Sequence, residues 1–299
     1  MRATATGATR ERVVFLLPAA LLLAAVVAVP ILRVVSLSFE RVDLEGRAVT
    51  SWTGLSAYGR LWVDSRWWAA LRNTAVFTGA STLLDTVLGV AIALVLHRRF
   101  RGRGALRAAV LIPWALPTSV MALAWAWIFN DSFGVANDLL ARLGLIDRPV
   151  AWLGEPRTAM AAMIVAEVWK TTPFVALIVL AGLQGIPEEI LEAARVDGLG
   201  AWARLRKIVL PLLVPSILVA AAFRAVQAYG AFDIVYVMTG GGPGGATETV
   251  SLYAFQNYFR YLDFGYGSAI ATQTTIFAAL LAWIVIRLAR PDGKEGEAR

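Results

Sequence analysis

Long apolar runs, each about the length of a membrane-spanning helix, recur along the chain and are separated by short polar segments. A helix needs about 20 mostly apolar residues to cross a hydrocarbon core of about 30 Å. Membrane barrel strands are shorter and alternate apolar with polar residues, so these runs predict helices. The fold class is therefore all-α, a polytopic membrane protein with six transmembrane helices, predicted at residues 13–36, 69–96, 105–129, 159–183, 208–229 and 267–288.

The amino-acid composition agrees with this pattern and excludes several kinds of functional site. The chain is 58% hydrophobic and only 16% charged, which is too apolar for an ordinary soluble domain. It has no cysteine, which excludes disulfides, thiol catalysis and thiolate metal sites. His97 is its single histidine, so a histidine metal cluster cannot form. We expect no metal site, no catalytic residue and no cofactor bound by this chain.

The basic residues are distributed unequally between the two sides of the predicted membrane. Sixteen lie in the terminal segments and the even-numbered loops, and eight lie in the other loops. Lysine and arginine concentrate on the cytoplasmic side, so we expect both termini to be cytoplasmic and the first span to be retained. This distribution explains the net charge of +7 without a nucleic-acid partner. The bilayer is the partner, and the cluster at residues 98–107 can meet anionic head groups.

A polar helical segment at about residues 187–210 lies between two apolar spans. Pro187 opens a helix that continues through Glu192, and Gly198 permits a left-handed turn to a second, basic helix. From its chemistry alone the segment is either a docking site for a partner or a helical hairpin lying on lipid, which Trp202 would suit. No segment matches the nucleotide-binding pattern GxxxxGK[ST], so energy for uphill transport must come from a partner or an ion gradient.

Three stretches resemble the permease subunits of ABC importers. Glu-Ala-Ala at 192–194, followed by Asp-Gly at 197–198 and Leu-Pro at 210–211, resembles the signature of the superfamily. The stretches at 167–174 and 232–271 are similar to the carbohydrate branch that imports maltose, trehalose or glycerol phosphate. The resemblance covers about residues 13–288, and the equivalent subunit is the larger maltose permease. Here the loop at 37–68 is only about thirty residues long, as in the compact six-helix members.

This resemblance implies a type I importer permease fold and a set of partners. They are a second homologous permease, two copies of an ATP-binding subunit that holds ATP and Mg²⁺, and an extracytoplasmic sugar-binding protein. It implies residence in a bacterial or archaeal cytoplasmic membrane, with tails at 1–12 and 291–299 and a permease domain at 13–290. It assigns coupling to the ATPase to a set of residues in the polar segment: Glu192, Ala193, Ala194, Asp197 and Gly198.

Charged residues inside spans are costly and mark candidate substrate contacts. Two groups share one helix face each by their spacing: Glu167, Lys170, Thr171 and Phe174, and then Arg224, Gln227 and Ala231. The resemblance assigns sugar contact to these positions and adds Ala228. Carbohydrate hydroxyls need donors and acceptors, and sugar C–H faces pack on aromatic rings.

Structural roles remain open for the same residues. Glu167 and Lys170 are one turn apart and can neutralise each other, while Arg224 can snorkel or pair with the second permease. Asp85 can pair with Arg72 or with a neighbouring helix. The outer loop at 233–266 suits either docking of a binding protein or an interfacial aromatic belt.

Two other classes of protein remain alternatives. An ion-gradient-driven secondary transporter would use Asp85 or Glu167, but the chain shows no inverted repeat. An intramembrane enzyme would use Glu167 as general acid or base, but no second catalytic group accompanies it.

Overall fold

The structure is a computed structural model that describes residues 15–43 and 49–289. The chain divides into two compact units, one of residues up to Asp64 with Tyr253–Gln273, the other of Ser65–Leu252 with residues from Thr274 onward. The predicted tails at 1–12 and 291–299 lie outside the described residues, as does the start of the first predicted span.

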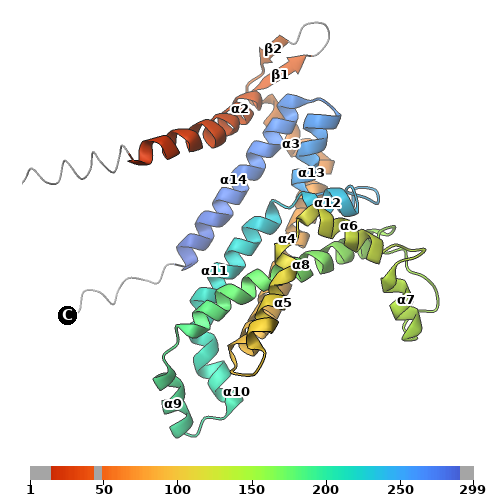
Figure 1. Cartoon of the computed structure of the whole chain (residues 1–299). Coiled ribbons are helices and arrows are strands. Elements are labelled where there is room, and N and C mark those ends of the chain that lie inside the picture. Colours follow the sequence, from red (N-terminus) through yellow and green to blue (C-terminus); the bar gives the residue numbers. More distant parts are fainter. Residues whose placement is uncertain (1–14, 44–48, 290–299) are drawn as a thin grey trace, which may run out of the picture. The chain divides into compact units, whose positions relative to one another are not determined.

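The described residues are predominantly helical (Figure 1). The helices are α2 (Val29–Leu37), α3 (Ser56–Val63), α4 (Ser65–His97), α5 (Arg103–Ala115), α6 (Thr118–Ile128), α7 (Val135–Arg142), α8 (Pro156–Gln184), α9 (Glu188–Val196), α10 (Ala201–Arg204), α11 (Leu210–Tyr229), α12 (Asp233–Met238), α13 (Val250–Phe255) and α14 (Phe264–Ala289). Short π-helical turns are η1 (Ala24–Ala28), η2 (Leu205–Val209) and η3 (Gln256–Arg260), and the strands are β1 (Glu40–Asp43) and β2 (Val49–Trp52).

Five helices in the described part of the chain are long and apolar enough to cross a membrane. They are Phe15–Leu37, Ser65–His97, Pro156–Gln184, Ala201–Tyr229 and Phe264–Ile284. The sixth predicted span, at 105–129, is not one continuous helix, because α5 and α6 meet at an angle of 93°. The predominantly helical membrane class is confirmed with five to six candidate spans, and the predicted third span is a bent pair of helices.

Pro117 accounts for the break between α5 and α6. Leu116 adopts an extended backbone with φ −72° and ψ 140°, as expected of a residue that precedes proline. Pro117 has no N–H to donate to the preceding turn, so the helix ends there and a new one starts at Thr118. The apolar run predicts helices here correctly, but hydropathy alone does not indicate the change of direction.

The first unit contains the only strands of the described residues. β1 and β2 pair as an antiparallel hairpin, with Glu40 opposite Trp52, in the region predicted only as a loop. In the same unit Asp64 accepts hydrogen bonds from the phenols of Tyr253 and Tyr266. Burial and the hydrogen bond to Asp64 raise the pKa of Tyr253 to about 12. The Tyr253 phenol is therefore a neutral donor throughout the physiological pH range.

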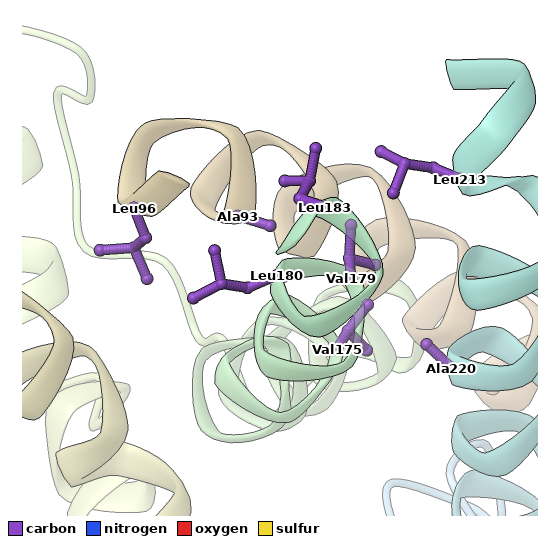
Figure 2. Packing of buried hydrophobic residues seen from close by; sticks show 8 residues of the cluster. All are labelled: Ala93, Leu96, Val175, Val179, Leu180, Leu183, Leu213 and Ala220. Atoms are coloured by element: carbon purple, nitrogen blue, oxygen red, sulfur yellow. The ribbon is translucent and has the colours of Figure 1, made fainter. Parts of the chain in front are cut away.

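The core of the second unit lies where α4, α8 and α11 pack together. Figure 2 shows the buried side chains at this junction, which come from all three helices: Ala93, Leu96, Val175, Val179, Leu180, Leu183, Leu213 and Ala220. Gly89 lets α4 approach α8 closely, since a Cβ there would lie 2.6 Å from Cγ1 of Val175. Close packing of these helices fixes the relative positions of the polar side chains that they carry.

Candidate functional site

Three charged side chains, one from each core helix, meet inside the second unit. Asp85 lies on α4, Glu167 on α8 and Arg224 on α11. Nε of Arg224 donates to Oδ2 of Asp85 at 2.7 Å, and Nη2 donates to Oε1 of Glu167 at 3.0 Å. The exposed fractions of the three side chains are 0%, 8% and 1% for Asp85, Glu167 and Arg224. The guanidinium thus links all three helices.

Further hydrogen bonds complete the surroundings of this ionic cluster. Asp85 accepts hydrogen bonds from the hydroxyls of Thr171 and Thr172 at 3.0 to 3.1 Å. Nη1 of Arg224 donates to Oε1 of Gln227 at 3.3 Å. Buried charges are costly unless paired and hydrogen-bonded, and these contacts meet that requirement.

The pairing decides between the structural roles predicted for these residues. Arg224 does not snorkel, and Asp85 pairs with a neighbouring helix rather than with Arg72. Lys170 does not form an ion pair with Glu167; its Nζ donates instead to the hydroxyl of Thr118 at 3.0 Å. The direct ion pair that the spacing of Glu167 and Lys170 allows is therefore not formed, and the carboxylate pairs with Arg224 on α11 instead.

A cavity of about 300 Å³ opens beside the ionic cluster. Its lining comes from α5, α6, α8, α11, α12 and the turn between the last two: Trp114, Thr118, Glu167, Lys170, Thr171, Arg224, Gln227, Gly230, Ala231, Phe232, Asp233 and Ile234. The bend between α5 and α6 contributes Trp114 and Thr118, one on each side of the break.

Six of the eight predicted substrate residues line this cavity, and two do not. The ring of Phe174 packs between those of Trp114 and Phe223, at centroid distances of 5.9 and 5.0 Å. Ala228 is fully buried. Trp114 and Thr118 were missed, because the pattern that predicted one straight span gave no sign that a bend would turn them toward α8.

Several polar atoms at the cavity have no partner among the described residues. Oε1 of Glu167 binds Arg224, while its Oε2 accepts no hydrogen bond. The amide oxygen of Gln227 faces Arg224, which leaves the amide nitrogen as a donor. Lys170 uses one of its three donors on Thr118. The cavity therefore presents a carboxylate oxygen of Glu167 and the donor groups of Gln227 and Lys170 to a polar solute.

The polar segment between α8 and α11 forms a helical hairpin. The N–H of Leu199 donates to the carbonyl of Ala194 at 3.0 Å, and the N–H of Gly198 donates to that of Arg195 at 3.0 Å. This arrangement is a Schellman-type helix end, which requires a left-handed residue. Gly198 supplies it with φ +77°. The glycine turn that the sequence predicts is thus present between α9 and α10.

The predicted coupling residues differ in exposure. Glu192, Ala193, Asp197 and Gly198 lie at the surface. Ala194 is only 3% exposed, so its side chain packs within the hairpin and is not available to a partner. Val196 and Trp202, beside them, are 88% and 72% exposed. The hairpin therefore presents exposed apolar and charged side chains on an element that joins α8 to α11, both of which line the cavity.

Comparisons with known proteins agree on one family. The family described as the binding-protein-dependent transport system inner membrane component matches residues 85–290. The trehalose/maltose transport system permease protein of Thermococcus litoralis is 46% identical over 235 residues, which cover 79% of this chain and 78% of that protein. The trehalose transport system permease protein of Mycobacterium tuberculosis is 39% identical over 296 residues, covering 97% and 94% of the two chains.

The fold agrees with the family. A chain in the crystal structure of a bacterial ABC transporter involved in the import of alginate superposes with a TM-score of 0.82 at 21% identity, covering 97% of this chain and 99% of that one. The fold and the site therefore define a multi-pass membrane permease of the ABC importer type. The chain belongs to the family of inner-membrane components of binding-protein-dependent transport systems.

Proposed function

We propose that this permease passes a carbohydrate through the cavity between α8 and α11. The observation that carries the proposal is the position of fixed, unpartnered hydrogen-bonding atoms in a cavity whose walls continue directly into the hairpin with the Glu-Ala-Ala sequence. A sugar needs several donors and acceptors around it, together with an apolar surface for its C–H faces.

Each lining residue has a distinct role in this proposal. Oε2 of Glu167 accepts a hydrogen bond from a sugar hydroxyl. The amide nitrogen of Gln227 and the ammonium of Lys170 donate hydrogen bonds to other sugar oxygens. Trp114 lines the cavity and offers an aromatic side chain for the C–H faces of a sugar. Arg224 is a positioning residue, since its donors hold the acceptors of Glu167 and Gln227.

Thr171 and Ala231 complete the lining. The hydroxyl of Thr171 donates to Asp85, so it contributes to the rigidity of the cluster. Ala231 leaves room beside Gln227 for the solute.

The named relatives support carbohydrate as the substrate class. Two are permeases of trehalose/maltose and trehalose systems, and the sulfoquinovosyl glycerol transport system permease protein of Agrobacterium fabrum is 40% identical over 278 residues, covering 93% of this chain and 90% of that protein. All three solutes carry several hydroxyl groups. A permease for any of these solutes must bind hydroxyl groups, and the hydrogen-bonding groups that line the cavity suit this.

The energy for transport comes, in this proposal, from separate ATP-binding subunits. The chain works with a second homologous permease. Two ATPase copies hold ATP and Mg²⁺, and one of them binds the hairpin of α9 and α10, called here the coupling hairpin. A binding protein delivers the solute on the outer side. Glu192, Ala193, Asp197 and Gly198 lie at the surface where such contact is made, while Ala194 supports them from within.

The transport cycle follows from these connections. Closure of the ATPases moves the hairpin, and α8 and α11 transmit this movement because they flank it. Arg224 ties both helices to α4, so they respond as one body near the cavity. The cavity then opens outward to accept solute, and hydrolysis of ATP restores the inward-facing state.

The gradient-driven alternative would need Asp85 or Glu167 as a proton or ion carrier. Both carboxylates are engaged with Arg224, and Asp85 also accepts from two threonines. An ion carrier must exchange its partner in each cycle, and the buried ion pairs that hold both carboxylates to Arg224 oppose that exchange.

Uptake by proteoliposomes containing the complete complex tests the proposal. ATP is enclosed, and the binding protein with radiolabelled trehalose or maltose is supplied outside. Accumulation of a sugar that requires ATP supports the proposal. Purified complexes that hydrolyse ATP with binding protein present, yet accumulate neither these sugars nor any of a panel of disaccharides, would overturn carbohydrate as the substrate class.

A further inference from the structure

A second cavity, of about 620 Å³, lies next to the coupling hairpin and takes no part in the proposed sugar pathway. It is bounded by the ends of α4 and α8 and by α9, α10 and η2, all within the second unit. α4 ends at His97 and α8 ends at Gln184. Both helices are long and apolar enough to cross a membrane, so we expect the cavity beside their ends to lie near the boundary between the hydrocarbon core and water.

The rim of the cavity carries excess positive charge. Arg98, Arg195 and Arg204 line it, and none of the three forms an ion pair within the described residues. Glu188 is the one acidic residue of the lining, and it pairs with Arg99 at 3.7 Å. Three guanidinium groups around one concave site attract an anion that can accept several hydrogen bonds, as a phosphate group does.

The inner wall of the same cavity is apolar. Leu94, Leu183 and Val209 contribute to it from α4, α8 and η2. Trp202 lies at the cavity with 72% of its side chain exposed, and tryptophan favours the head-group level of a bilayer. A soluble anion would use only the arginine rim. A molecule with both an anionic group and a hydrocarbon chain would use the whole cavity.

We propose that this cavity binds the phosphate group of an anionic phospholipid, with an acyl chain along the apolar wall. Basic pockets between membrane helices on the cytoplasmic side are suited to such head groups. The site joins α4 and α8 to the coupling hairpin, so a bound lipid stabilises the position of α9 and α10. This assignment is independent of which solute the central cavity carries.

The test compares phospholipid retention by the purified complex and by two of its variants. Arg98→Gln and Arg195→Gln each remove one rim charge, and neither side chain makes a hydrogen bond or ion pair that holds the fold in the described residues. Arg101→Gln is the matched control, since Arg101 belongs to the same exposed basic run but does not line the cavity. Assembly is checked by co-purification of the partner subunits.

Mass spectrometry then quantifies the phosphatidylglycerol that stays bound after transfer from nanodiscs into mild detergent. Each rim variant is expected to retain about fivefold less than the wild type, and the double variant less again, while Arg101→Gln retains the wild-type amount. Equal retention by all variants overturns the site. A second arm measures binding of radiolabelled inorganic phosphate to delipidated complex. Arginine-dependent phosphate binding without any retained lipid overturns the lipid assignment and identifies a soluble phosphate ligand.

Discussion

Arg224 is the residue on which the local organisation of the cavity depends. Its guanidinium is 1% exposed and contacts carboxylates from two other helices. Two buried carboxylates without this cation would repel each other in a medium of low dielectric constant. The same guanidinium fixes the amide of Gln227, so the orientation of the proposed sugar contacts also depends on it.

Arg224→Gln is therefore expected to destabilise the permease strongly. Removing one partner of a buried ion pair costs about 3–5 kcal/mol, because the remaining charges stay buried. Glu167→Gln is the milder comparison, since Asp85 still neutralises Arg224 and the amide oxygen can still accept. Thermal unfolding of the purified complex measures both. Equal stability of Arg224→Gln and wild type would contradict the role of the cluster.

Gln227→Leu tests direct solute contact at the same scale. Loss of one neutral hydrogen bond is expected to raise the KM for sugar uptake about three- to tenfold, with little change in the maximal rate. Phe174→Leu is the comparison, because Phe174 does not itself line the cavity and packs behind it on Trp114 and Phe223. A raised KM in Phe174→Leu and not in Gln227→Leu would reverse the assignment of these two residues.

At the level of residues, helical spacing predicted which side chains share a face but not which ones pair. Glu167 and Lys170 are one turn apart, yet Glu167 binds an arginine that is distant in sequence. Phe174 shares a predicted face but packs against Phe223, and Ala228, which only the resemblance assigned to the sugar site, is fully buried. Which side chains pair across α4, α8 and α11 depends on how each helix is rotated about its axis. A single sequence does not indicate that rotation.

The coupling hairpin is the element whose geometry depends most on a single position. Gly198 forms the turn of the hairpin with a left-handed backbone conformation, φ +77°. Gly200, two residues later, has φ −63°. No atom lies within 4 Å of a Cβ built at either glycine. The two positions therefore differ in backbone conformation and not in available space.

Gly198→Val is expected to impair coupling, and Gly200→Val is its matched control. A β-branched residue at positive φ is strained by roughly 1–3 kcal/mol, which opens the turn or displaces α10. Co-purification of the ATPase and ATP-driven uptake are both expected to fall in Gly198→Val and to persist in Gly200→Val. Unchanged uptake by Gly198→Val would show that coupling does not require the left-handed turn at Gly198.

Elements were predictable where apolar runs are uninterrupted, as in α4, α8 and α11. The third predicted span shows what hydropathy does not capture, since Pro117 breaks it and turns Trp114 and Thr118 toward the cavity. The β hairpin in the loop at 37–68 was also missed. Its strands are only four residues long each, which is too short for a reliable alternating pattern.

At the scale of the whole molecule, membrane orientation is the prediction that follows from charge distribution. The chain has no cysteine, so single cysteines can report it without a background from this subunit. Ser132→Cys, between α6 and α7, is expected to react with an impermeant maleimide on spheroplasts. Lys207→Cys, in η2, is expected to react only after lysis. Both positions are exposed in the structure. The opposite labelling pattern would invert the proposed topology.

The class of protein was predictable from the sequence because three separate stretches carry the resemblance, and the family and fold comparisons confirm it. The solute was not predictable, since the lining that selects it includes residues brought in by the bend and by α12. Partners and orientation remain predictions, because they depend on subunits and a membrane around this chain.

Energy coupling is the central claim, and uptake by the reconstituted complex tests it most directly. Proteoliposomes containing both permeases and the ATPase receive binding protein and labelled sugar outside, with ATP or a non-hydrolysable analogue inside, and with or without a protonophore. Accumulation that requires hydrolysable ATP and withstands the protonophore is the predicted result. Accumulation without ATP that the protonophore abolishes would contradict the account and establish a gradient-driven transporter.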